Sequence, residues 1–491
     1  MPMSKKSETL TRREHEKIVA ETVEDATAEL KDRVAELQYN LEKLQRMFFG
    51  RSSEKLTNDN NETQQTLFEE PKSEPIREEK PPGERKKRSP GKPRYGAQLE
   101  RKVVEVDFDE EPCCVECNRT LKVVGVEKSE KLEFIPATVR VLEFHRKKYA
   151  CSCKQSGVRT APVLPTAFPK SAVTDETRAH FLVQKFVDHL PYYRQSKILK
   201  RSGVELSDSS IGHYVLEAAD LLAPIMVAMR AELLKSRYLQ VDETTFPVLK
   251  TETSKPGALQ AYLWTYGIPW STVIFDYRRS RSGKHPAEFL GEFEGVLQSD
   301  RYAGYNAVRS RDNIIDVACW AHARRKFIDA QSSAARRVKP ILQLIGKLYT
   351  IENQARERRL SFEERRKLRE ELAAPVLEEL RELLVQVSLK ALPQSPLGKA
   401  AEYTLGSWEP LIEYVKHGEV EIDTNLLENS IRPVALGRKN YLFAGSDTGA
   451  EAAATIYSLT ETCRRLEINP YNYLVEVFRV KIGRASCRER V

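Results

Sequence analysis

The sequence lacks several features that mark whole classes of protein. It has no uninterrupted apolar run approaching the ~20 residues that a membrane helix needs. The opening MPMSKKSETLTRREHEK has no apolar centre of the kind found in signal peptides. Cysteine is scarce, at eight in 491 residues, and in a reducing compartment we expect no disulfide framework. These absences argue against secreted and membrane classes and predict a cytoplasmic protein.

The overall composition is that of folded protein. Hydrophobic residues make up 41% and charged residues 31%, which is too apolar for general disorder. At roughly 150 residues per domain, the length predicts about three folded units. The 79 Lys and Arg against 71 Asp and Glu give a net charge of +8, which permits a polyanionic partner without establishing one.

The N-terminal part predicts a coiled coil followed by a linker. Within 20–56, apolar residues recur at alternating spacings of four and three: Leu30, Val34, Leu37, Leu41, Leu44 and Phe48. This pattern predicts a homo-oligomer, although one amphipathic helix lying on another domain would show it too. Residues 57–100 are dominated by charge and proline and are interpreted as a linker, whose GERKKRSPGKPRYG stretch either contacts phosphate or is simply solvated.

Four cysteines predict a zinc-binding β-rich module over 105–160. Cys114 and Cys117 are spaced CxxC, and Cys151 and Cys153 are spaced CxC, within a unit too small for a large core. VVEVDF and TVRVLEFHRKKYAC alternate as strands do. Unligated reduced thiols are the alternative, and Cys113 is a possible substitute for Cys114. The isolated Cys319 and Cys463 are expected to be buried structural thiols.

Residues 173–220 have the spacing of a helix-turn-helix. The turn falls at Gly203, and the second helix is capped near Ser207 or Asp208. The candidate recognition helix carries Ser209, Ser210, His213 and Tyr214. An ordinary helix pair joined by a glycine turn has the same pattern.

From 237 the pattern changes to strands. RYLQVDETTFPV, QAYLWTYG and STVIFDY are followed by the helical HPAEFLGEF, and then by the strands GVLQSD and NIIDVACW. A charged helical stretch over about 322–417 follows. This order predicts a ribonuclease H-like catalytic domain over 237–455 with a helical insertion. The fold class is therefore multidomain α/β, with a C-terminal segment over 456–481.

Three acids in this domain predict a divalent metal site. Asp242 is placed at the end of the first strand and Asp300 at the end of the fourth, and Asp423 can cap a short helix that carries Glu428. Neighbouring strands ~4.8 Å apart would bring the two aspartates together, where they repel unless a cation lies between them. Mg²⁺ or Mn²⁺ suits such hard oxygen ligands, and the chemistry implied is metal-assisted attack on a phosphodiester.

Basic and aromatic residues surround these acids in the sequence. Arg301, Tyr302, Tyr305 and His322 are among them, and Trp320 and Tyr441 are candidates for stacking on an exposed base. An ordinary solvated surface is the alternative for about half of the set. The residues predicted to contact DNA are Arg324, Arg325, Lys326, Arg432, Arg438 and Lys439.

These motifs resemble a known family. VDETTFPV, HPAEFLGEFEGVLQSDRYAGYN, CWAHARRKF and ENSIRPVALGRKNYLFAGSDTGAE closely resemble transposases of the insertion-sequence-66 family, and FFGRSSEKL resembles the end of its leucine-zipper segment. The resemblance covers nearly all of 20–480. Two positions depart from it: the second cysteine pair is CxC where a wider spacing is usual, and Thr424 stands where an Asn is frequent.

The resemblance implies a specific enzyme. Asp242, Asp300 and Glu428 would be the DDE catalytic triad of a transposase that binds element ends, cuts DNA and joins the freed 3′-hydroxyl to a target. It implies DNA as partner, possible helper proteins from the same element, and a bacterial, nucleoid-associated location. A non-catalytic DNA-binding protein derived from a transposase is the alternative, and a nuclease without strand transfer is a weaker one.

The last ten residues, IGRASCRERV, are interpreted as an artefact. Read back into codons, residues 482–491 can be written ATC GGA AGA GCG TCG TGT AGG GAA AGA GTG, a string that looks like a common sequencing-library adapter. We therefore expect a different natural continuation after 481, and we leave Cys487 out of functional reasoning.

Overall fold

The computed structural model describes residues 34, 138–149, 158–249 and 258–488. The chain divides into two compact units, 1–50 with 143–491 and 51–142, and nearly all the described residues belong to the first. The predicted linker, the zinc ligands Cys114, Cys117, Cys151 and Cys153, and every heptad position but the helical Val34 lie outside the described residues. The coiled coil and the zinc module therefore stay predictions.

The first described strands are very short. β1 (Lys148–Tyr149) and β2 (Arg159–Thr160) pair antiparallel. The long strand expected from TVRVLEFHRKKYAC is wrong for 138–147, which have no regular structure. All of these residues are exposed, so alternation here does not mark a buried face.

Three helices follow: α3 (Asp175–Phe186), α4 (Tyr192–Arg201) and α5 (Asp208–Leu233). Gly203 lies in the turn before α5 at a φ of 82°. The Ser207 side chain accepts the Ser210 N–H and caps α5, as expected. Because α5 is 26 residues long, it continues past the predicted domain end at 220.

By length and composition alone, α5 passes the test for a helix able to cross a membrane, and it is the one helix in the described ranges that does. A single helix of this kind is weak evidence. Here Val215, Ala218, Ala219 and Leu222 are buried in a core shared with α3 and α14.

The centre of the fold is a five-stranded mixed sheet. Its strands are β3 (Tyr238–Leu249), β4 (Ala258–Gly267), β5 (Val273–Arg278), β6 (Gly295–Ser299) and β7 (Ile314–Ala318), in the order β5-β4-β3-β6-β7. β3, β4 and β5 pair antiparallel, whereas β6 and β7 extend the sheet in parallel. All five strands were expected from the sequence.

The sheet is buried on both faces because its side chains alternate. In β5, Val273 and Phe275 join a core with the flanking helices, whereas Ile274 joins a second core on the opposite face. The second core includes α6 (Lys284–Leu290) and α7 (Asn306–Arg309), with the short η1 (Ala303–Tyr305) between β6 and α7.

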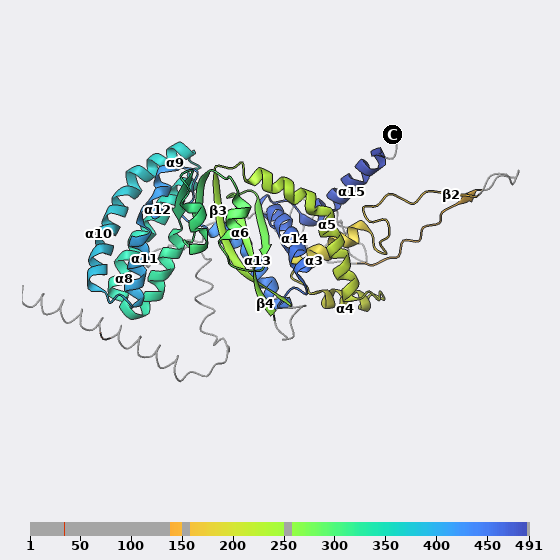
Figure 1. Ribbon diagram of the computed structural model, residues 1–491, viewed down its shortest axis with the longest axis horizontal. Helices are drawn as coiled ribbons and strands as arrows, with labels where there is room; N and C mark the ends of the chain where they lie inside the picture. The colour runs from red at the N-terminus through yellow and green to blue at the C-terminus, as the bar shows by residue number, and fades with distance from the viewer. Residues whose placement is uncertain (1–33, 35–137, 150–157, 250–257, 489–491) are drawn as a thin grey trace, which may run out of the picture. The chain divides into compact units, whose positions relative to one another are not determined.

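A helical region follows the last strand. It runs through α8 (Trp320–Glu357), α9 (Phe362–Leu368), η2 (Arg369–Ala373), α10 (Ala374–Lys390), α11 (Pro396–Gly406), α12 (Trp408–Ile412) and η3 (Glu413–Lys416). These helices occupy the range where the insertion was expected, and α8, α10 and α11 pack against one another around a third core (Figure 1).

The chain then returns to the sheet. α13 (Asn425–Tyr441) contacts β3 and β4, and α14 (Asp447–Arg465) packs on β5. α15 (Pro470–Arg488) contacts α3 and α14 and continues into the predicted adapter-derived residues. α14 also runs across the domain boundary predicted at 455/456.

Candidate functional site

Two aspartates lie side by side where the parallel ladder between β3 and β6 ends. Gln240 pairs with Gln298 in that ladder, so Asp242 and Asp300 are the next residues on the same side of each strand. The expectation that Asp242 ends its strand is wrong, because β3 continues to Leu249. β6 stops at Ser299, so beyond this point β3 pairs with β4 and, near its end, with Ala444 through a single bridge at Val248.

Asp242 is the electrostatic centre of the site. Burial raises the pKa of Asp242 well above its ordinary value, and the negative charges of Glu428, Glu243 and Asp300 raise it further. His322 acts in the opposite direction. The carboxylates of Asp242, Asp300 and Glu428, from β3, the end of β6 and α13, therefore lie close together, and Glu243 adds negative charge from the adjacent position on β3.

Glu243 is a site residue that sequence reasoning missed. Its side chain is only 2% exposed; Arg281 donates to Oε1 from Nε at 2.8 Å and from Nη2 at 2.5 Å, and the Tyr305 hydroxyl donates to Oε2 at 2.5 Å. Burial nevertheless raises the pKa of Glu243. Alternation in β3 points Glu243 away from Asp242, and no spacing in the sequence identifies its distant partners.

The turn after β6 fixes Asp300. Arg301 has a φ of 71°, a left-handed conformation that is uncommon outside glycine. The turn lets the Tyr302 N–H donate to Asp300 Oδ1 at 2.8 Å, while the Arg301 guanidinium pairs with Asp316. The Tyr302 backbone and the Arg301 guanidinium therefore both support the turn.

Glu428 lies on the first turns of α13 and faces the first turn of α8. Its Oε1 lies 3.7 Å from His322 Nδ1, and its Oε2 lies 3.4 Å from Arg325 Nη2. Neither Glu428 Oε1 nor His322 Nδ1 has a hydrogen-bond partner among the described residues, although both atoms are buried. Together with Cys319, these residues form a group whose potential ligand atoms lie within 4.8 Å of one another.

A buried amide network holds the start of α13 against the sheet. Gln240 and Gln298 are fully buried and hydrogen-bonded to each other at 2.9 Å. Gln240 Nε2 also donates to the Asp423 carbonyl at 2.8 Å, and Gln298 Nε2 donates to the Glu421 carbonyl at 2.9 Å. The two residues that precede the aspartates by two positions therefore also position the segment that leads to Glu428.

The expected cap at the start of α13 is more elaborate than the sequence indicated. Asp423 accepts the Asn425 N–H at 3.0 Å, but Thr424 is the residue at the cap position, and the helix is 17 residues long rather than short. Asp423 is also bound by the Tyr349 hydroxyl at 2.9 Å, and burial raises its pKa to about 6.

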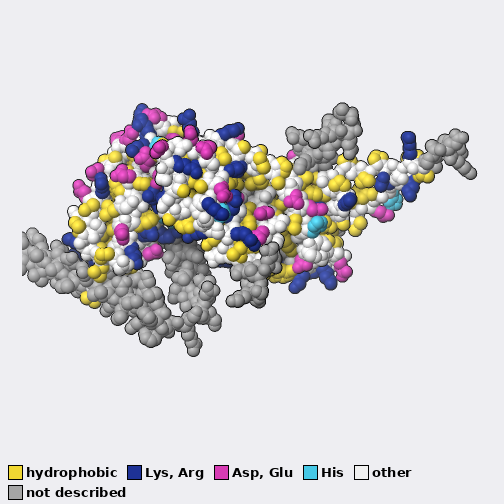
Figure 2. All heavy atoms as spheres, in the orientation of Figure 1, with side chains coloured by type: hydrophobic (Ala, Val, Ile, Leu, Met, Phe, Trp, Pro, Cys, Tyr) yellow, Lys and Arg dark blue, Asp and Glu magenta, His cyan; other side chains and the backbone are white. Residues whose placement is uncertain are grey.

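The residues predicted to contact DNA divide into two groups. Lys326, Arg432 and Lys439 are exposed and Arg324 is partly buried, whereas Arg325 contacts Glu428. Arg438 instead donates to the carbonyl and hydroxyl of Thr245 and so joins α13 to β3. Lys and Arg side chains are interspersed with acidic ones on the face in Figure 2, with several close together near its middle.

The prediction that two aromatic residues stack on an exposed base is wrong. Trp320 is fully buried, and its indole N–H donates to the Leu411 carbonyl at 2.8 Å, so it cannot stack on a base. Tyr441 is hydrogen-bonded to Tyr457, and its ring is covered by the Lys185 ammonium at 3.5 Å. The other sequence expectation about isolated side chains is confirmed: Cys319 and Cys463 are free and buried.

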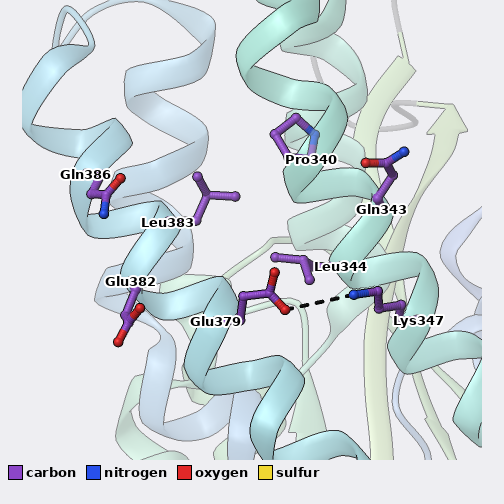
Figure 3. Close-up of a pocket in the computed structure, with 8 residues that line it drawn as sticks. All are labelled: Pro340, Gln343, Leu344, Lys347, Glu379, Glu382, Leu383 and Gln386. Atoms are coloured by element: carbon purple, nitrogen blue, oxygen red, sulfur yellow. Dashed lines mark ion pairs between the residues drawn. The ribbon is translucent and has the colours of Figure 1, made fainter. Parts of the chain in front are cut away.

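A separate hollow of about 710 Å³ lies between α8 and α10 (Figure 3). An ion pair between Lys347 and Glu379 crosses it at 3.8 Å. None of its lining residues was predicted as a site residue, and it contains none of the clustered carboxylates.

Comparison with known proteins assigns most of the chain. The model of the family described as "Transposase IS66 family" matches residues 170–452. The "zinc-finger binding domain of transposase IS66" matches 111–154, and "Transposase C of IS166 homeodomain" matches 36–104.

Relatives in Sinorhizobium fredii are similar over most of their length. The uncharacterized protein y4jD is 31% identical over 400 residues, covering 78% of this chain and 76% of its own. The uncharacterized protein y4qI is 31% identical over 474 residues, covering 90% and 85%. The family resemblance expected from the motifs is confirmed.

Proposed function

Since the chain belongs to the IS66 family of transposases, we propose that it is a DDE enzyme that cuts and joins DNA at the ends of an insertion element. The observation that carries the proposal is the convergence of Asp242, Asp300 and Glu428 from three distant parts of the sequence. Burial raises the pKa of Asp242, and the charges of Glu428 and Asp300 raise it further, as expected for acids brought close together.

The architecture supports a ribonuclease H-like core. Three antiparallel strands extended by two parallel ones, in the order β5-β4-β3-β6-β7, place Asp242 on the central strand and Asp300 just after its parallel neighbour. The helices over 320–416 separate Asp300 from Glu428 in the sequence, as an insertion would.

The side chains fit a divalent metal. Glu428 Oε1 is buried without a hydrogen-bond partner in the described part of the chain, and the surrounding carboxylates offer hard oxygen donors of the kind Mg²⁺ and Mn²⁺ prefer. Asp242, Asp300 and Glu428 would hold the metal. When bound, divalent ions stabilise the attacking and leaving oxygens of a phosphodiester.

The remaining residues would position the DNA. Lys326 lies 4.4 Å from the Tyr403 ring centre, and the Tyr403 hydroxyl donates to the Asp300 carbonyl, so a cation stands close to the aspartate turn. With Arg324, Arg432 and Lys439 it would contact backbone phosphates. The zinc module and the helix-turn-helix would recognise the ends of the element, and the heptads would hold the oligomer together. The same proposal includes helper proteins from the element and a location at the nucleoid.

Substituting each acid by its amide tests the proposal. Asp242→Asn, Asp300→Asn and Glu428→Gln should each reduce Mg²⁺- or Mn²⁺-dependent cleavage of end-containing DNA by on the order of 10³-fold or more. Binding of the same DNA in a gel-shift assay should persist, because phosphate contacts come from other residues. Asp329→Asn, an exposed change on α8, is the matched control and should cut normally.

The outcomes separate the alternatives. Cleavage that persists in Asp242→Asn contradicts the triad. A wild-type protein that binds end DNA but never cuts it favours a non-catalytic DNA-binding protein, and cutting without joining favours a nuclease.

A further inference from the structure

We propose that His322 is a metal ligand of this site, supplying a nitrogen donor beside Glu428. The inference rests on the proposed metal-dependent function and adds a residue that the three acids do not include. His322 Nδ1 and Glu428 Oε1 face each other at 3.7 Å across the junction of α8 and α13.

Contacts between the starts of α8 and α13 bring the His322 and Glu428 side chains close together. Cys319 precedes α8 and Thr424 precedes α13, and both the Thr424 N–H and its hydroxyl donate to Cys319 Sγ at 3.3 Å. The Trp320 N–H also donates to the Ile422 carbonyl at 3.2 Å. The cap positions are therefore in contact, and the first turns of the helices lie next to each other.

The separation and burial of the two atoms favour a shared ligand. At 3.7 Å they are too far apart for a hydrogen bond, and neither finds another partner among the described residues. Buried polar atoms left unpaired cost free energy, so such a pair needs an explanation. Two ligands of one octahedral ion lie about 3 Å apart, so closing the gap needs a shift of less than about 1 Å.

Cys319 is near these atoms but is not a third ligand. Its sulfur already accepts two hydrogen bonds from Thr424, and a soft sulfur donor suits the hard cations Mg²⁺ and Mn²⁺ poorly. Its role is to align the two helices.

A second His–Glu pair in the chain provides a matched comparison. His417 Nε2 lies 3.3 Å from Glu413 Oε1, within hydrogen-bonding distance, and both side chains are 22% exposed. His322 and Glu428 are similarly buried, at 20% and 12%, yet remain apart. The difference lies in whether the imidazole nitrogen is satisfied by the protein.

Mn²⁺ bound to the full-length protein tests the proposal without DNA. Pulsed electron paramagnetic resonance of the wild type should show ¹⁴N coupling from a coordinated imidazole. His322→Gln should abolish this coupling and weaken Mn²⁺ binding by at least about tenfold, since even loss of an outer partner of a metal ligand costs that much. His417→Gln should change neither.

The measurement on unmodified protein does not depend on how any variant folds. If Mn²⁺ binds, and Asp242→Asn weakens its binding, but the wild type shows no ¹⁴N coupling, the role of His322 is overturned while the metal site stands. If Mn²⁺ binding is insensitive to both Asp242→Asn and Glu428→Gln, the metal-dependent function itself fails. Coupling that survives in His322→Gln also overturns the assignment.

Discussion

Two clusters of charged side chains adjoin the segment that leads into α13, and they are built in opposite ways. The paired cluster consists of Glu352, Arg356, Arg365, Arg369 and Glu421, and joins the helical region to that segment. The carboxylate cluster consists of Asp242, Glu243, Asp300 and Glu428. Both contain buried acids, but only the first neutralises them all.

In the paired cluster each carboxylate is surrounded by guanidinium groups. Arg365 Nη2 lies 2.6 Å from Glu352 and 2.9 Å from Glu421, and Arg369 Nε lies 2.7 Å from Glu352. Burial would raise the pKa of Glu421, but Arg365 and Arg356 together lower it to about 2. These acids remain charged because the fold supplies their counterions.

In the carboxylate cluster the same kind of burial has the opposite result. Burial raises the pKa of Asp242, and three more acids raise it further, whereas the cations nearby serve Glu243 and Glu428. Burial of acidic side chains alone therefore does not identify a metal site. What distinguishes a candidate metal site is buried negative charge for which the chain supplies no matching cation.

The largest expected effect comes from removing charge from two acids of the carboxylate cluster, and it is an effect on catalysis. The double variant Asp242→Asn/Glu428→Gln should cut no more slowly than the worse single variant, because residues that serve one step act as a unit and their losses, on the order of 10³-fold or more, do not multiply. Single-turnover cleavage of end-containing DNA measures this. Losses that multiply would mean that the two acids act in separate steps.

Breaking the paired cluster should mainly reduce stability. Glu352→Ala leaves Arg365 and Arg369 buried without their shared partner and should lower the free energy of unfolding by about 3–5 kcal/mol. Urea denaturation measures the change. Glu363→Ala, which removes an exposed partner of Arg366, is the control and should have little effect. A loss equal to that of the control would contradict the role of the cluster.

Removing charge from the carboxylate cluster should stabilise the metal-free protein. Because the folded pKa of Asp242 is raised, the folded state binds the extra proton, so this group's contribution to stability grows as pH falls through that pKa. At pH values above that pKa, Asp242→Asn should raise the free energy of unfolding by about 0.5–2 kcal/mol, which is the usual gain when a destabilising group is removed.

Thermal unfolding in chelator across the neutral and mildly acidic range checks this, and the difference between wild type and variant should shrink as pH falls. The pH dependence expected for Glu421 is the opposite. Its contribution to the stability of the folded state is present above its ordinary pKa and is lost as pH falls towards about 2. A variant that is less stable than the wild type at neutral pH would contradict the prediction.

The smallest effect is expected at an exposed pair. Lys347 and Glu379 are 58% and 62% exposed, so Lys347→Ala should change the free energy of unfolding by only about 0–1 kcal/mol. The same urea titration measures it. A loss as large as that of Glu352→Ala would show that the helical region depends on surface charge rather than on its buried pairs.

Local pattern predicted the strands of the sheet well. Alternation located β3 to β7, and strand ends located Asp300 and, less accurately, Asp242, whose strand continues because β4 still pairs with it. Family motifs carried the choice of Glu428, which lies far from the aspartates in the sequence.

Long-range contacts could not be predicted in the same way. Glu243 became part of the site through Arg281 and Tyr305, and Arg438 was drawn to Thr245 across 193 positions. Trp320 has the aromatic side chain that stacking on a base requires, but it lies in the core of the helical region. Each error concerns where a side chain points, which depends on partners that local spacing does not identify.

The hydrogen bond from Gln240 to the Asp423 carbonyl spans 183 positions and has a consequence for the order of events during synthesis. β3 and β6 are separated in the sequence only by β4, β5 and α6 and are made before the helical region, whereas α13 reaches them only after that region has been completed. A growing chain therefore carries both aspartates well before Glu428 emerges. The proposed metal site is therefore incomplete in any chain that stops short of α13.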